Sequence, residues 1–137
     1  MKRLFVVTAS ATLLLAAPIA MSGSVLAFEL NGAWASDAHN CAKVFVRKGA
    51  LFTFADMSDV YGGGFIIEGD QITGKYARCR IKAKKDDGKT INLVAACATD
   101  IMLQNVQFYL REVDANNVIR MFPGMDRMEI NYARCPA

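Results

Sequence analysis

Residues 76–98, YARCRIKAKKDDGKTINLVAACA, contain the most informative pattern of this chain. The two halves of this segment flank Asp86-Asp87-Gly88, and an Asp-Gly pair between alternating apolar positions is typical of a β-hairpin turn. The alternating apolar positions are Cys79, Ile81, Ala83, Ile91, Leu93, Ala95 and Cys97. Because successive side chains of a strand point to opposite faces, the pattern predicts a hairpin with one apolar face that carries a cysteine at each end.

The opposite face of the first strand is predicted to be basic, because Arg78, Arg80, Lys82 and Lys84 alternate with the apolar residues. A row of cations suits an anionic glycan, a lipid headgroup or an acidic protein surface. The structural alternative is that exposed lysines prevent edge-to-edge pairing of strands. No aromatic residues interleave with these cations, so we expect no nucleic-acid partner. The four residues are candidate partner-binding residues.

The N-terminus predicts export. A basic start over residues 1–3 precedes an apolar run over residues 4–17, and small residues lead up to a cleavage site after Ala27. The apolar run is shorter than the ~20 residues that a membrane-spanning helix needs. We therefore expect a signal peptide over residues 1–27 and one mature domain over residues 28–137, periplasmic or secreted, with no stable membrane span after cleavage.

The four cysteines all lie in the expected mature domain, and an even count in a small exported protein implies two disulfides. Of the three possible connectivities, the hairpin favours Cys79–Cys97, which leaves Cys41–Cys135. No Cys-x-x-Cys pair occurs, so the cysteines do not predict a zinc site. Loss of Lys2 and Arg3 takes the 16 basic residues to 14 against 13 acidic ones, so the overall charge does not predict polyanion binding.

Short β-branched and aromatic runs separated by Gly, Asp and Asn turns make up the rest of the mature chain. They predict an all-β fold, a small antiparallel barrel of about eight strands. The expected helical content is a short helix near residues 37–42, N-capped by Ser36, and a helical turn within residues 95–102. The other expected strands are residues 30–36, 43–47, 50–54, 65–67, 104–113, 118–122 and 128–133, and residues 71–75 lead into the hairpin.

Two further segments are candidate contacts for a partner. Gly62, Gly63 and Gly64 precede a strand and not a helix, so they predict a mobile loop or bulge and not a phosphate-binding loop. Phe122 and Met125 flank a Pro-Gly turn, where they would either anchor a partner or plug one end of the barrel.

No residue set predicts catalysis, a cofactor or a metal. His39 lies between Asp37 and Cys41, but one histidine with one carboxylate falls short of a metal-ligand set, and we expect an exposed turn histidine. The mature chain has two serines, and neither lies in a Gly-x-Ser-x-Gly motif. Glu68 is the nearest candidate for a catalytic carboxylate, although its position before Gly69 indicates a turn.

The run Leu30-Asn31-Gly32-Ala33-Trp34, followed by Cys41, resembles the opening of small periplasmic β-barrel inhibitors of bacterial proteases. Those proteins begin Leu-x-Gly-x-Trp and reach a cysteine several residues later, and lipocalin-like barrels share the Gly-x-Trp start. The resemblance implies an eight-stranded up-and-down barrel with Trp34 closing one end. Beyond these residues the chain departs from the inhibitor pattern, with four cysteines.

Together these observations predict an exported, monomeric, non-enzymatic binding protein, an inhibitor or an envelope-interaction module that uses its basic strand face. The expected partner is a protein or an anionic molecule of the envelope or host surface. One alternative is a lipocalin-like carrier of a small apolar ligand, whose cavity would be lined by Phe52, Phe54, Val106 and Phe108. The other is a hydrolase with a cryptic site at Glu68.

Overall fold

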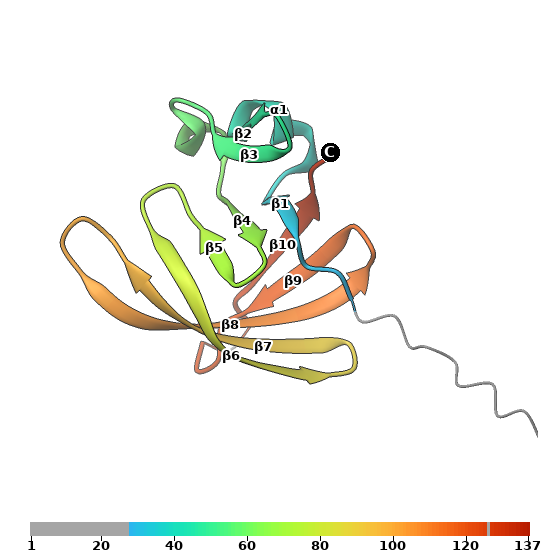
Figure 1. The fold of residues 1–137 in the computed structure, drawn as a ribbon. Helices are drawn as coiled ribbons and strands as arrows, with labels where there is room; N and C mark the ends of the chain where they lie inside the picture. Colours follow the sequence, from blue (N-terminus) through green and yellow to red (C-terminus); the bar gives the residue numbers. More distant parts are fainter. Residues whose placement is uncertain (1–27, 126) are drawn as a thin grey trace, which may run out of the picture.

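The structure, a computed structural model, describes residues 28–125 and 127–137, so the signal peptide expected over residues 1–27 lies outside the described part. Eight antiparallel strands close a barrel in the order β1, β10, β9, β8, β7, β6, β5 and β4 (Figure 1). The strands β2 and β3 form a separate two-stranded sheet beside the barrel. The prediction of a small antiparallel barrel is therefore confirmed.

The barrel strands are β1 (Gly32–Ala35), β4 (Gly64–Glu68), β5 (Gln71–Thr73), β6 (Arg78–Asp87), β7 (Thr90–Ala98), β8 (Leu103–Asp114), β9 (Asn117–Met121) and β10 (Glu129–Arg134). The separate sheet consists of β2 (Phe45–Lys48) and β3 (Leu51–Phe54). The helical segments are the 3-10 helices η1 (Ala38–Asn40) and η2 (Ser58–Tyr61) and the short α1 (Cys41–Val44). A short helix near residues 37–42 is thus confirmed.

The barrel interior is filled by side chains from alternate positions of the strands. In β7 every second residue is buried, which is the period expected of a strand with one face in a core. Burying one large aliphatic side chain contributes roughly 1.5–3 kcal/mol to stability. The interior cluster includes Trp34, Phe65, Ile67, Ile72, Ile91, Leu93, Leu110, Val118 and Tyr132.

The strands β1 and β4 are buried on both faces. Trp34 and Phe65 point into the barrel, whereas Ala33 and Ile66 belong to a second buried cluster with Phe45. This second cluster forms where α1, β2 and β3 pack on the outside of the barrel, over β1 and β4 (Figure 1). A strand covered on both faces reads as a nearly continuous apolar run, as residues 64–67 do.

Arg134 ties the segment before β1 to the last strand. Its guanidinium lies 4.3 Å from the centre of the Trp34 ring, within the range of a cation–π interaction. The same group donates hydrogen bonds to the carbonyl oxygens of Glu29 and Asn31. The Trp34 indole N–H donates to the carbonyl of Leu30 at 2.8 Å, so the buried tryptophan leaves no unpaired polar atom.

The strands β6 and β7 form the expected hairpin, but their register agrees with the prediction only at the end that carries the cysteines. Cys79 lies directly opposite Cys97, which confirms the register on which the disulfide prediction depends. The pairing then shifts between Ile81 and Ala83, so that Lys82 is the extra residue of a β-bulge and Lys84 pairs with Leu93.

The prediction of one continuous basic face is wrong beyond Ile81. Residues directly opposite one another in a sheet share a face, so Lys84, which is itself exposed, lies on the face of the buried Leu93. Arg78 and Arg80 stay on the outer face, opposite Ala98 and Ala96. A bulge moves every later side chain of its strand to the other face, which the alternation in the sequence does not reveal.

The helical turn expected within residues 95–102 is also wrong. The strand β7 continues to Ala98, and the chain then reverses in a tight turn in which the Thr99 N–H donates to the carbonyl of Met102 at 2.9 Å. Pairing with both β6 and β8 holds these residues extended, which overrides the helical preference of the alanines.

Two disulfides connect Cys41 with Cys135 and Cys79 with Cys97, as expected. They close loops with sequence separations of 94 and 18 residues. In the chain-entropy model such loops contribute about 4–5 and about 3 kcal/mol to stability. The longer loop ties α1, outside the barrel, to the end of β10.

Full reduction is expected to lower the melting temperature by more than about 10 °C, because both loops then add entropy to the unfolded chain. Thermal unfolding followed by circular dichroism, with and without reductant, measures this change. Non-reducing peptide mapping provides the control. A Cys41–Cys79 linkage in the map, or an unchanged melting temperature, would contradict the assignment.

Candidate functional site

A groove with a volume of about 790 Å³ lies on the outside of the barrel, beside β3. One wall is β3 itself, and the other is the outer face of β4, β5 and the start of β6. Gln71 and Thr73 belong to this outer face because Ile72 between them is buried in the interior. The groove residues used below are Leu51, Phe52, Thr53, Phe54, Ile66, Glu68, Lys75, Tyr76, Arg78 and Asp100.

Two side-chain bridges close the groove where β3 ends. The Lys75 ammonium donates to the carbonyl oxygen of Ala55 at 2.7 Å, which links the β5–β6 turn to the residue after β3. Next to it, the Tyr76 hydroxyl donates to the Asp59 carboxylate at 3.2 Å. This hydrogen bond and the negative charge of Asp59 raise the pKa of Tyr76 above its usual value. These two contacts link the β5–β6 turn to the segment after β3 at this end of the groove.

The basic residues of β6 have different surroundings in the structure. Arg80 forms an ion pair with Asp70 at 2.7 Å, and Lys85 pairs with Asp87 at 3.5 Å. Within the described residues no carboxylate lies within 4.0 Å of the Arg78 guanidinium, which lines the groove. Exposed ion pairs contribute little to stability, but they neutralise charge locally. Of the four predicted basic residues, Arg78 is therefore the one that lines the groove without an ion-pair partner in the described part of the chain.

The three glycines lead from η2 into β4, and they lie beside Ser36, the residue that follows β1. The Gly63 N–H donates to the Ser36 hydroxyl at 3.1 Å, and the Ser36 N–H donates to the carbonyl of Gly63 at 2.9 Å. Gly64 is the first residue of β4 and pairs with Ala35. The hydrogen bonds to Ser36 hold this loop in place, and its role as a partner contact stays a prediction.

Gly64 is needed because its neighbours leave no room for a side chain. A Cβ atom there would lie 2.7 Å from the carbonyl oxygen of Trp34 and 2.8 Å from the Phe45 ring. A Cβ atom at Gly63 would have no heavy atom within 4 Å. The two adjacent glycines therefore form a matched pair for substitution.

Gly64→Ala is expected to destabilise the protein by about 1–3 kcal/mol, because β4 must move away from β1 to relieve the overlap. For a domain of this size the melting temperature would fall by roughly 5–15 °C. Gly63→Ala is the control and should change the melting temperature by no more than a few degrees. Equal melting temperatures for the two variants would refute the close contact.

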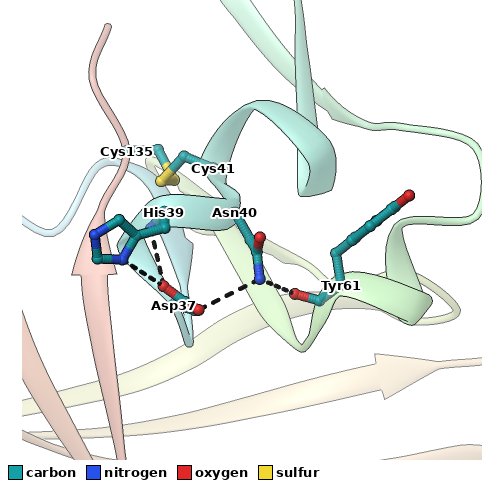
Figure 2. Close-up of a disulfide and its surroundings, with 6 residues drawn as sticks. All are labelled: Asp37, His39, Asn40, Cys41, Tyr61 and Cys135. Carbon is teal, nitrogen blue, oxygen red and sulfur yellow. Dashed lines mark hydrogen bonds and ion pairs between the residues drawn. A yellow bond between two sulfur atoms is a disulfide. The ribbon is translucent and has the colours of Figure 1, made fainter.

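Asp37 organises the exposed turn before the Cys41–Cys135 disulfide (Figure 2). Its carboxylate accepts a hydrogen bond from the His39 N–H at 2.9 Å and so caps η1. Asn40 links Asp37 to the carbonyl of Tyr61 through its side-chain amide, at 3.4 and 3.1 Å (Figure 2). The expected cap by Ser36 is wrong, since the N–H and the hydroxyl of Ser36 both bond to Gly63 instead.

His39 is exposed, as expected of a turn residue, with 96 % of its side-chain surface accessible. Its ring lies 3.2 Å from the Asp37 carboxylate (Figure 2). Across residues 28–125 and 127–137 no group of three or more His, Cys, Asp or Glu side chains is arranged to hold a metal ion. The carboxylate of Asp37 has a pKa below its usual value, first because it accepts the His39 backbone N–H and then through the His39 ring.

In His39→Ala, the pKa of Asp37 is expected to stay below 3.8, because the backbone hydrogen bond, the largest cause, survives the substitution. Since the pKa is lowered in the folded state, the cap stabilises the turn above pH 3.8 and is lost as the pH falls through the lower, folded value. Carboxyl-carbon NMR titration of wild type and variant measures both pKa values. A return of the pKa to 3.8 would assign the effect to the ring instead.

The four residues proposed to line a carrier cavity do not meet. Phe108 is buried in the barrel interior and Val106 packs against the same cluster. Phe52 and Phe54 pack against Phe45 in the second cluster, outside the barrel. The predicted cavity lining is therefore wrong, because β3 is not a barrel strand.

The remaining candidates lie apart from the groove or at its edge. Phe122 is half-buried, with the Arg120 guanidinium 4.8 Å from its ring centre, whereas Met125 is exposed in the β9–β10 turn. Glu68 lies exposed at the end of β4, next to the turn as expected, and contributes to the far end of the groove. Among the ion pairs of the described residues, none involves Glu68.

Comparison of the chain with protein-family models, with curated proteins and with solved structures found no match. Among the residues that the structure describes, no helix has the length and apolar character needed to span a membrane. The groove is thus the main guide to function. Sequence reasoning missed it because one wall is β3, which was expected to be a barrel strand, and the other wall is the outer face of β4, β5 and β6.

Proposed function

We propose that this chain is an exported, non-enzymatic binding protein that holds a segment of another protein in the groove between β3 and the outer barrel wall. The observation that carries the proposal is the groove itself, which combines apolar walls with an unneutralised arginine. Phe52, Phe54 and Ile66 supply the apolar surface, and Arg78 supplies the charge. Aromatic residues and arginine are the residue types most enriched at the centres of protein interfaces.

Exposed apolar side chains around the groove extend this surface. Leu51 at the tip of the β2–β3 sheet is 57 % exposed, and Tyr76 in the β5–β6 turn is 70 % exposed. Ile101 follows the groove residue Asp100 and is 93 % exposed. Apolar side chains gathered around a groove are typical of protein-binding sites, because a partner removes them from water.

The proposal narrows the basic face expected from the sequence to Arg78. Arg80 is neutralised by Asp70, and Lys84 lies beyond the bulge. Export is supported by the two disulfides, which are typical of proteins that fold in an oxidising compartment. Inhibition of a protease, which the start of the chain suggests through its resemblance, is one activity that such binding would serve.

Site-directed photo-crosslinking in cells that express the full chain tests the proposal. A photo-reactive residue replaces Leu51 at the groove, Lys82 on β6, or Val113 near the β8–β9 turn, away from the groove. We expect discrete crosslinked protein bands from position 51, fewer from position 82 and none from position 113. Reversing the groove charge with Arg78→Glu should reduce the crosslinks from position 51 at least about fivefold, since charged hydrogen bonds contribute 1.5–3 kcal/mol or so.

The matched control for Arg78→Glu is Arg80→Glu, which changes the same charge on the same face but outside the groove. Crosslinks that disappear with both substitutions would assign binding to the basic face in general. Bands from position 82 alone would reject the groove as the contact surface. An absence of crosslinks at all three positions would reject a stable protein partner under those conditions.

A further inference from the structure

We infer that the partner binds as an extended segment that adds a strand to the free edge of β3. This inference rests on the proposed function and specifies how the same groove recognises its partner. Strand addition uses main-chain hydrogen bonds for affinity and alternating side-chain contacts for specificity.

The groove follows the edge of β3 and not one of its faces. Four successive residues, Leu51, Phe52, Thr53 and Phe54, all line it. Because successive side chains of a strand point to opposite faces, a groove on one face would be lined by only two of them. Contact with all four places the groove along the edge where the backbone is accessible.

The hydrogen-bond pattern shows which backbone groups face the groove. The Ala55 N–H donates to the carbonyl of Val44 at 2.9 Å, which makes this a hydrogen-bonded pair. Antiparallel pairs alternate between hydrogen-bonded and non-hydrogen-bonded, so Thr53 bonds to β2 whereas Phe52 and Phe54 do not. The N–H and C=O groups of Phe52 and Phe54 therefore point into the groove, where no backbone partner is found among the described residues.

The edge of β3, which is four residues long, also lacks the charges, the proline and the bulge that protect many natural strand edges. Such edges usually carry lysine or proline, or are bent by a bulge. The sequence of β3 is Leu-Phe-Thr-Phe, without a charge or a proline, and its pairing with β2 is regular. The neighbouring strand β2 has Arg47 and Lys48, so within this small sheet the unprotected edge is the one in the groove.

The groove has the dimensions of one added strand. Four residues of β3 span roughly 13 Å at 3.3 Å per residue, strands lie ~4.8 Å apart, and packed sheets lie ~10 Å apart. These spacings give roughly 600 Å³ for one four-residue strand, which fits within the groove of about 790 Å³. A peptide backbone matches the paired donors and acceptors of Phe52 and Phe54, whereas a lipid chain would leave them unpaired.

The charges of the groove favour an acidic side chain on the partner opposite Arg78. The charged groove residues are Glu68, Lys75, Arg78 and Asp100. Lys75 already donates to Ala55, and Glu68 lies at the opposite end, on β4. Asp100 lines the same end as Arg78 but does not come within 4.0 Å of it in an ion pair. The guanidinium therefore remains available for a bidentate carboxylate contact.

A random heptapeptide library displayed on phage, selected on the full-chain protein, supplies the probe for the test. The most enriched peptide is synthesised, and its affinity is measured for wild type, Phe52→Ala and Phe52→Pro. Both variants lose the ring, but only proline also loses the N–H that faces the groove. Proline is tolerated at an edge-strand position whose N–H is not paired.

Strand addition predicts that Phe52→Pro binds the peptide at least about tenfold more weakly than Phe52→Ala, because one main-chain hydrogen bond is lost and a partner carbonyl is left unpaired. Amide exchange of wild type is the second measurement, and it requires no variant. The N–H groups of Phe52 and Phe54 should exchange rapidly in the free protein and at least about tenfold more slowly with the peptide bound.

Equal binding by Phe52→Pro and Phe52→Ala, with unchanged exchange at Phe52 and Phe54, would overturn strand addition. Failure of the library to yield a binder would overturn it as well. If wild type sediments as a dimer and Phe52→Pro abolishes that dimer, the free edge of β3 binds a second copy of this chain instead of another protein. If crosslinks from position 51 persist in Phe52→Pro, the proposed binding function stands and only the strand pairing fails.

Discussion

The strand β1 is buried on both of its faces, and this burial links the barrel to the layer outside it. Trp34 fills the barrel interior and is covered by Arg134, while Ala33 and Ala35 face outward against Val44 and Phe45. The strand β1 has only four residues, yet its pairing with β10 and β4 closes the barrel. Burial of its outer face requires a second layer outside the barrel.

That second layer creates the groove. The chain leaves β1, turns at Asp37 and forms α1 and β2, whose buried residues cover the outer side of β1 and β4. The Cys41–Cys135 disulfide fastens this layer to the end of β10, and Lys75 fastens its other end to the β5–β6 turn. Held at both ends, β3 lies beside the barrel wall without pairing to it. The unpaired edge is thus a consequence of how the barrel is closed.

Local patterns predicted much of this structure because they reflect short-range physics. The alternation around Asp86-Asp87-Gly88 identified the hairpin, and the hairpin register placed Cys79 opposite Cys97. Elimination then gave Cys41–Cys135. The errors lie where distant residues decide. Strand pairing on both sides kept Ala98 extended instead of helical, and Asp37 capped the turn because Ser36 was already bonded to Gly63.

The sequence predicted the fold class, the hairpin and the favoured disulfide pairs, because two-residue periodicity and turn chemistry act between neighbours in the chain. The three-dimensional packing determined which strands belong to the barrel and where the bulge at Lys82 breaks the basic row. It also decided that Phe52 and Arg78 share a groove. These features depend on how long-range packing satisfies both faces of β1 and β4. The apolar run of a strand can indicate that both faces are buried, but it does not identify the distant segment that packs on each face.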